Sequence, residues 1–409
     1  MKRIITLLIL AAITLSACGN ISAPSLSDGI MPRDVVQISS PEEFGEVISD
    51  FGVRLFKESF TADKNTLISP LSVLSALAMT ANGADSQTLA QMESVLGAES
   101  STLNAYVKSY TDALVSGEKY KLSLANSIWF TDDERFTVNE EFLQTNADYY
   151  RADIYKAPFN KKTCGDINTW VKEKTDGMIK KVLDEIPGDA IMYLINALAF
   201  EAEWMEIYEK HQVRDATFTA IDGTKRTVDM MYSDESRYLE DERATGFIKY
   251  YSGGKYAFAA LLPNSGISLE DYIETLDGEA LHKMLSEPTY CAVEAGLPKF
   301  EFEYDTEMSA VLSDMGMPDA FDYKNADFTR LGTSTRGNIY ISRVIHKTYI
   351  SVGERGTKAG AVTVIEMKDC AMAEPIEPKR VTLDRPFLFM LIDTETCLPF
   401  FIGTVTDIK

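Results

Sequence analysis

The stretch from Val352 to Met367 constrains the fold most tightly, because its residues alternate in size and polarity. On one side of the alternation the residues are first small and then larger and apolar: Thr357, Ala359, Ala361, Thr363, Ile365 and Met367. The residues between them mix charged and β-branched side chains. Since successive side chains of a strand point to opposite faces, the pattern predicts a strand with one buriable face.

A segment of opposite character follows directly, from Lys368 to Lys379. It contains two prolines and five charged residues in twelve positions, a composition typical of an exposed loop. The chain therefore carries a segment able to enter a sheet, and this segment runs directly into a loop that a peptidase could grip.

The first residues predict export rather than a folded element. Lys2 and Arg3 precede an apolar run, residues 4–15, that is too short to span a bilayer comfortably. The run ends in Leu-Ser-Ala-Cys-Gly at residues 15–19, which resembles a bacterial lipobox. The resemblance implies cleavage before Cys18, diacylation of its thiol and a lipid-anchored protein at the cell surface, or an extracellular one if it is shed. The alternative is an ordinary secretory signal.

Composition divides the chain into a signal, a tether and one large domain. Residues 1–17 are the predicted signal peptide, and residues 18–41, rich in Ser, Pro and Gly, predict a lipidated flexible tether. From residue 42 to residue 409 there is no composition break, repeat or linker. A single domain is therefore expected over this range.

The strongly negative net charge argues against nucleic acid as a partner. The chain carries a formal net charge of −22, and removal of residues 1–17 takes away two positive charges to leave −24. Nucleic-acid binding is not expected, because nothing would neutralise the phosphates. A field of this sign would help to capture cationic proteins, or it simply keeps the chain soluble.

Cysteine and histidine spacing predicts neither metal nor cofactor. Apart from Cys18, the cysteines are widely spaced and form no CxxC pair, so free thiols are expected at Cys164, Cys291, Cys370 and Cys397. The three histidines lie near no other His or Cys, so no metal site is expected. Enzymatic activity is not expected either, because Cys370 has no sequence-local base and no GxSxG elbow is present.

Apolar spacing places most helices in the first half of the chain and most strands in the second. Helical patterns cover residues 43–61, 70–81, 85–96, 101–115, 167–183, 268–284 and 306–315. Strand patterns cover residues 122–130, 193–200, 227–232, 238–241, 246–250, 256–262, 291–304, 338–352 and 380–405. This order predicts an α+β domain.

Six segments in order, spread over about 340 residues, resemble the motifs of the serpin family. They are residues 65–84, 194–204, 297–304, 315–328, 341–348, and 385–387 with 400–403. The resemblance implies a single serpin domain with three β-sheets, about eight or nine helices and an exposed reactive-centre loop at about residues 354–384. It also implies that the alternating segment is the hinge by which this loop enters the main sheet.

Family spacing assigns roles to residues in this loop. The hinge consists of Glu354, Gly356, Thr357, Ala359, Gly360, Ala361 and Thr363. Sixteen residues after Glu354, the reactive bond falls between Cys370 and Ala371, or between Met372 and Ala373 if the longer loop shifts the register by two. Since neither Cys370 nor Met372 is positively charged, elastase-like peptidases are expected as targets.

Four polar residues lie inside apolar runs, namely Ser69, Ser72, Asn196 and His346. Buried polar groups need partners, so the residues alone are compatible with one mutual hydrogen-bond cluster or with four separate sites. The resemblance places them together, in the family's shutter beneath the sheet that opens.

The chain departs from the family pattern at several hinge positions. Arg355, Lys358, Gly360 and Val362 differ from the usual residues, but Thr357 and the small residues of the buriable face are kept. Residues 201–203, Glu-Ala-Glu, replace a usual Lys-Gly pair, and the sequence assigns no consequence to this change.

The resemblance implies a monomeric suicide-substrate inhibitor that traps a serine peptidase as a covalent acyl complex. The first alternative is a non-inhibitory serpin that acts as a binding or chaperone module. Bulky or charged residues on the insertion face would favour that alternative, and they are absent here. A lipid-anchored surface enzyme is the second alternative, which a glycine-rich or His-paired site would have supported.

Overall fold

The computed structural model describes residues 21–26, 29–35, 43–114, 117–188, 190–357 and 377–409. Nine α-helices lie in this part of the chain: α1 (Glu43–Ser59), α2 (Pro70–Ala81), α3 (Ser86–Leu96), α4 (Ser100–Ala113), α5 (Glu140–Tyr150), α6 (Lys161–Lys174), α7 (Leu269–Glu274), α8 (Gly278–Ser286) and α9 (Ser309–Asp314). Two short 3-10 helices follow Glu209 and Met317. None of the described helices is long and apolar enough to cross a membrane.

The strands form three sheets. A nine-stranded sheet contains β1 (Thr66–Ile68), β6 (Val213–Thr219), β7 (Lys225–Glu240), β8 (Ala244–Tyr250), β9 (Tyr256–Pro263), β10 (Thr289–Pro298), β15 (Lys379–Thr382), β16 (Phe387–Asp393) and β17 (Leu398–Val405). A six-stranded sheet contains β2 (Tyr120–Thr131), β4 (Asp153–Ala157), β5 (Met192–Glu203), β11 (Phe300–Glu307), β13 (Ile345–Gly353) and β14 (Gly356–Thr357). The third sheet pairs β3 (Phe136–Val138) with β12 (Gly332–Ser334). The predicted α+β domain with three sheets is confirmed.

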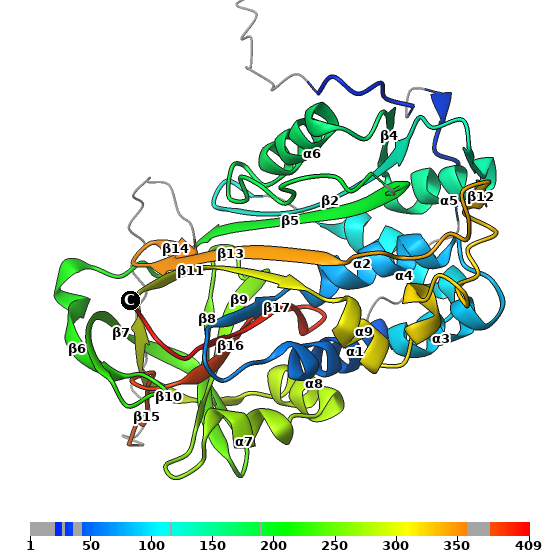
Figure 1. Ribbon diagram of the computed structural model, residues 1–409. Helices are drawn as coiled ribbons and strands as arrows, with labels where there is room; N and C mark the ends of the chain where they lie inside the picture. Colours follow the sequence, from blue (N-terminus) through cyan, green and yellow to red (C-terminus); the bar gives the residue numbers. More distant parts are fainter. Residues whose placement is uncertain (1–20, 27–28, 36–42, 115–116, 189, 358–376) are drawn as a thin grey trace, which may run out of the picture.

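The six-stranded sheet has the order β11-β13-β14-β5-β2-β4. Its long strands run across the molecule in Figure 1, with β14 at one end and α6 above β2 and β5. The two-residue strand β14 stands between β13 and β5 and pairs antiparallel with both. Among the described residues no register joins β5 directly to β13, so β14 alone connects the two parts of this sheet.

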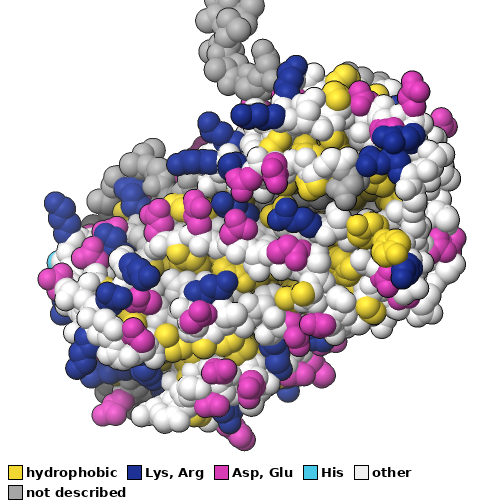
Figure 2. All heavy atoms as spheres, in the orientation of Figure 1, with side chains coloured by type: hydrophobic (Ala, Val, Ile, Leu, Met, Phe, Trp, Pro, Cys, Tyr) yellow, Lys and Arg dark blue, Asp and Glu magenta, His cyan; other side chains and the backbone are white. Residues whose placement is uncertain are grey.

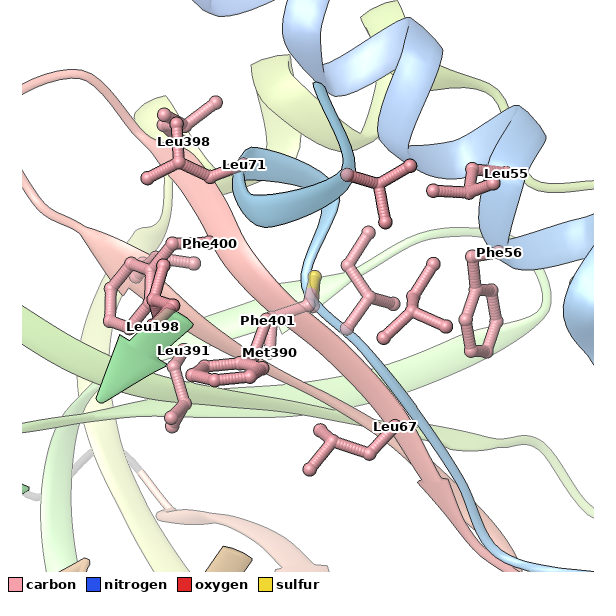
Figure 3. Packing of buried hydrophobic residues seen from close by; sticks show 14 of the residues in the cluster. Leu55, Phe56, Leu67, Leu71, Leu198, Met390, Leu391, Leu398, Phe400 and Phe401 are labelled. Carbon is pink, nitrogen blue, oxygen red and sulfur yellow. The ribbon is translucent and has the colours of Figure 1, made fainter. Parts of the chain in front are cut away.

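The main core fills the space between the helices and both large sheets. Figure 3 shows Leu55 and Phe56 of α1, Leu67 of β1, Leu198 of β5 and Phe401 of β17 as members of one buried cluster. All five side chains are buried. A second cluster beneath α6 surrounds the buried Trp129 and Trp170, so α6 is fixed to the sheet by its own apolar contacts.

The start of α2 shows how the sequence positions the centre of the fold. Ser69 is the N-cap and accepts a hydrogen bond from the Ser72 amide, and Pro70 occupies the first helical position. Both are strong helix-start signals. Since α2 is buried along most of its length, this cap places Ser69 and Ser72 inside the protein.

Three element predictions were wrong in extent. The pattern over 291–304 is two strands, β10 and β11, which belong to different sheets and separate at Lys299. The helix expected over 268–284 is two helices, because Asp277 caps a new one by accepting from the Ala280 amide. The strand expected from residue 338 begins only at Ile345. Periodicity persists across such breaks, so it does not reveal them.

The helix expected over residues 167–183 also has other bounds. Asn160 caps α6 by accepting from the amides of Lys162 and Thr163, so the helix begins earlier than its apolar spacing suggests. It ends at Lys174, and both Asp176 and Gly177 then adopt positive φ. Left-handed residues of this kind terminate helices.

The N-terminal stretch predicted as a flexible tether contacts the domain along most of residues 21–35. The Leu26 amide donates to Ile154 O of β4 over 2.8 Å, and Ser22 Oγ donates to Asp166 of α6 over 2.6 Å. The Arg33 side chain donates to the buried Asp148 of α5 over 2.8 Å. Polar composition alone does not show that the folded domain offers partners to these residues.

Candidate functional site

The hinge begins with a tight hairpin at the end of β13. Val352 pairs with Thr357 and Gly353 pairs with Gly356, which leaves Glu354 and Arg355 in the turn. On its other side β14 pairs with β5, Gly356 with Glu203 and Thr357 with Ala202. Both residues of β14 are therefore already inside the sheet.

Gly356 is required by this geometry. Its φ is +149°, and a Cβ atom placed on it would lie 2.0 Å from the Ala202 carbonyl oxygen. Any side chain would therefore collide with the backbone of β5. This close approach explains why a glycine precedes the predicted insertion strand.

Thr357 is the first residue of the predicted buriable face, and it is 3% exposed. Its hydroxyl lies 2.5 Å from the Tyr251 hydroxyl. Tyr251 is fully buried and stacks on Trp204, with ring centroids 4.4 Å apart. Trp204 in turn donates from Nε1 to Gly353 O over 2.8 Å, so an aromatic pair supports the base of the hinge.

The turn residue Glu354 forms an ion pair with Lys299, the residue between β10 of the nine-stranded sheet and β11 of the six-stranded sheet. Lys299 Nζ lies 2.9 Å from Glu354 and 3.0 Å from Asp229. The hydrogen bond from Lys299 lowers the pKa of Glu354, so the carboxyl stays ionised at neutral pH. The other turn residue, Arg355, pairs with Glu203 of β5.

The four predicted shutter residues come together in the structure. The Ser69 amide donates to His346 Nε2 over 3.1 Å, and Ser72 Oγ donates to Asn196 Oδ1. Asn196 also donates to Asn126 Oδ1 over 2.7 Å. One hydrogen-bonded chain thus joins α2, β5 and β2 on one side to β13 on the other.

His346 is neutral in this arrangement. Its Nε2 accepts a hydrogen bond, which requires an unprotonated nitrogen at that position. Burial lowers the pKa of His346 from 6.5 to about 4, because the charged form would lose its hydration.

A cavity of about 320 Å³ lies between β5 and β13, on the line that β14 begins. Its walls include residues 190–196, residues 336–348 and the buried face of α2, and all four shutter residues line it. We call this space the sheet gap. Figure 2 shows hydrophobic side chains among charged side chains of both signs on the face where the gap lies.

Several predicted site residues lie outside the described part of the chain. They are Cys18, Ala359, Gly360, Ala361, Thr363, Cys370, Ala371, Met372 and Ala373. Glu354, Gly356, Thr357 and the shutter residues are all described. Sequence reasoning missed Tyr251, Trp204 and Lys299, whose only sequence signals are a charge or aromatic ring near the end of a strand.

The described cysteines are free, namely Cys164, Cys291 and Cys397. Burial raises the pKa of the Cys164 and Cys397 thiols, so both are weak nucleophiles at neutral pH. Within the described ranges no group of three or more His, Cys, Asp or Glu side chains is arranged to hold a metal ion.

Comparison with known proteins covers nearly the whole domain. The family model described as Serpin (serine protease inhibitor) matches residues 46–408. An uncharacterized serpin-like protein of Thermococcus kodakarensis is 29% identical over 399 residues, which are 95% of this chain and 92% of the relative.

A solved structure is more similar still. The thermophilic serpin tengpin in its native state is 47% identical, with a TM-score of 0.89 over 94% of this chain and 100% of that one. The same protein in its latent state gives a TM-score of 0.81 at 46% identity, over 93% of this chain and 100% of that one. The present chain is therefore closer in structure to the native state of that protein.

Proposed function

Because this chain belongs to the serpin family of serine protease inhibitors, we propose that it is a suicide-substrate inhibitor of serine peptidases. The target cleaves the reactive-centre loop and forms an acyl-enzyme. The freed hinge then enters the sheet gap between β5 and β13 and carries the tethered peptidase with it. Inhibition succeeds when insertion outruns hydrolysis of the acyl bond.

The position of β14 is the observation that carries this proposal. Gly356 and Thr357 pair with both neighbouring strands, and the sheet gap continues from them along the same line. Residues 192–196 of β5, which border the gap, are only half-buried. The sheet thus offers unpaired strand edges to an entering strand.

The two registers of β14 support the insertion when they are continued. Along β5, Thr357 lies opposite Ala202, so the register would place Met367 opposite Met192, the first residue of that strand. Along β13, Thr357 lies opposite Val352. Both registers then bring Thr363 to the shutter, opposite Asn196 on one side and His346 on the other.

We expect the free energy of loop insertion to be strongly favourable. New ladder hydrogen bonds contribute ~0.5–1.5 kcal/mol each, and burial of Ile365 and Met367 contributes ~1.5–3 kcal/mol each. The sum is on the order of 10 kcal/mol, comparable to the stability of a whole domain. The uncleaved protein is therefore a kinetically trapped state.

The proposed reactive bond is Cys370–Ala371, with Met372–Ala373 as the second choice. Cysteine is small and apolar, which suits the shallow primary pocket of elastase-like peptidases. Lys368 carries the charge that a trypsin-like pocket needs, but it lies two residues upstream. From Thr357 to Cys370 the loop has 14 residues, a span of roughly 46 Å as a strand.

We also propose that the protein is exported as a monomer and anchored through lipid on Cys18. The apolar run and lipobox-like residues 15–19 support this location. Metabolic labelling with a fatty-acid analogue tests it, with Cys18→Ser as the control that removes the acceptor thiol. Label retained in Cys18→Ser would contradict anchoring at this residue.

Incubation with a panel of serine peptidases tests the inhibitory function. A denaturing gel should show a covalent complex with an elastase-like enzyme, and intact mass should show a released peptide of residues 371–409, which has 39 residues. Cleavage after Met372 would release 37 residues. A peptide starting at Asp369 together with tight trypsin inhibition would refute the assigned bond, and cleavage without any complex would favour the non-inhibitory alternative.

A further inference from the structure

Two residues that depart from the family's usual sequence contact each other in the structure. Arg355 differs from the usual hinge residue, which is acidic, and Glu203 ends the Glu-Ala-Glu run that replaces a Lys-Gly pair. They lie 152 positions apart in the chain, and the Arg355 guanidinium donates to Glu203 Oε2 over 3.0 Å. The sequence alone explains neither substitution, but in the structure the two residues form one ion pair.

Glu203 has a second cation beside it. Lys119 Nζ, just before β2, lies 2.6 Å from Glu203 Oε1. The Glu203 side chain is 8% exposed, whereas the side chains of Lys119 and Arg355 are 32% and 29% exposed. A nearly buried carboxylate is thus balanced by two partly exposed cations, one from the sheet and one from the hinge.

Backbone contacts tie this ion pair to the position of the hinge. Trp204 donates its amide to Arg355 O over 2.8 Å, and Glu203 is the register partner of Gly356. The pair therefore closes when β14 lies on β5. If the hinge left the sheet, Arg355 would move into water and Glu203 would keep only Lys119.

We infer that the Arg355–Glu203 ion pair positions the hinge on β5 and thereby raises the rate at which the loop enters the sheet after cleavage. The kinetic part rests on the proposed inhibitory function, whereas the positioning part does not. An acidic residue at position 355, as the family usually has, would set two negative charges side by side at a nearly buried site. Like charges so placed repel strongly, and the turn would leave β5.

Hydrogen exchange of the backbone amides of residues 353–357 in the intact protein tests the positioning part. Arg355→Glu should exchange roughly tenfold faster than the wild type, since a charge-assisted hydrogen bond becomes a repulsion. The charge swap Arg355→Glu with Glu203→Arg, combined with Lys119→Gln so that the new arginine does not face a second cation, should restore slow exchange. Glu201→Gln is the matched control, because Glu201 lies on the same face of the same strand two residues away, and it should exchange like the wild type.

The kinetic part is tested by cleaving each variant and following loop insertion through the fluorescence of Trp204, which contacts Gly353 O. Insertion should be about tenfold slower in Arg355→Glu and wild-type-like in the charge swap. More inhibitor should be consumed for each peptidase trapped by Arg355→Glu. A purely structural role would lower the melting temperature without this pattern of rescue.

Specific outcomes would overturn the inference. Folded Arg355→Glu with wild-type exchange, or a charge swap that stays as fast as Arg355→Glu, refutes the positioning role. If Arg355→Glu does not fold, Glu203→Gln serves instead, and unchanged exchange in that variant has the same meaning. A wild type that forms no covalent complex contradicts the proposed function, and the exchange result then decides the positioning role by itself.

Discussion

Replacement of Thr357 by arginine tests whether the predicted insertion face must stay small and uncharged. Thr357 is 3% exposed, and its hydroxyl is the partner of the fully buried Tyr251 hydroxyl. Arginine there would bring a charge into this nearly fully buried site, beside a neutral tyrosine hydroxyl. An unpaired buried charge costs several kcal/mol, enough to expel the hinge from the sheet.

A milder change at the same position shows how much the Thr357 hydroxyl contributes to docking of the hinge. Thr357→Val keeps the shape but leaves the Tyr251 hydroxyl without its partner, at a cost of about 1–3 kcal/mol. That corresponds to a factor of roughly 5–150 in the docking equilibrium of the hinge. Thr357→Val should therefore still inhibit but with more inhibitor consumed, whereas Thr357→Arg should become a cleaved substrate.

The assay is titration of a peptidase that forms a covalent complex with the wild type, followed on a denaturing gel. Thr335→Arg is the control, because Thr335 is exposed and lies outside the hinge, and it should inhibit normally. Full inhibition by Thr357→Arg would refute insertion of this face.

Cleavage of the loop should raise the melting temperature sharply, because an inserted strand completes the sheet, and calorimetry that finds equal temperatures for cleaved and intact protein would favour the non-inhibitory alternative. Gly356→Ala should displace β14, since its Cβ would lie 2.0 Å from the Ala202 carbonyl, and unchanged amide exchange at Thr357 would contradict this. His346 has a pKa of about 4 in the folded protein and 6.5 in the unfolded chain, so the unfolded chain binds a proton first as pH falls. Stability present above pH 6.5 should be lost between pH 6.5 and 4, by up to about 3 kcal/mol, and His346→Gln should lose less over that range in urea unfolding; equal losses would be inconsistent with a buried neutral His346.

The sequence predicted those parts of the site that depend on local pattern. Alternation in size marked Thr357 as buriable, whereas the four polar residues of the shutter were brought together by the resemblance to the family and not by their pattern alone. The contacts of Arg355 with Glu203 were not predictable, because they depend on a register between segments 152 positions apart. Charge alone gives each residue many candidate partners in a chain with 102 charged residues, 40 basic and 62 acidic.

The secondary-structure elements likewise divide into those that local pattern predicted and those that it did not. The helices α2, an almost wholly apolar run that begins at Pro70, and α3 were found close to their bounds. In contrast, β1 and β4 were missed because strands of three and five residues carry little periodicity. The N-terminal stretch was assigned by composition. Its contacts depend on Asp148 and Asp166, two buried acids in distant helices that need partners.

The contacts of residues 21–26 with β4 and α6 have a consequence for the direction in which the proposed inhibitor would act. With Cys18 lipidated as proposed, two residues, Gly19 and Asn20, separate Cys18 from Ile21, three Cα steps with a reach of at most about 11 Å, and Ile21 packs beneath α6. The domain would then stand on the membrane by one end of its sheet. Along β2, the level of Ile154 is eight residues from the level of Ala202, where the hinge starts, or roughly 26 Å. The loop would thus meet a peptidase on the far side from the lipid, and insertion would draw the captured enzyme down toward the bilayer.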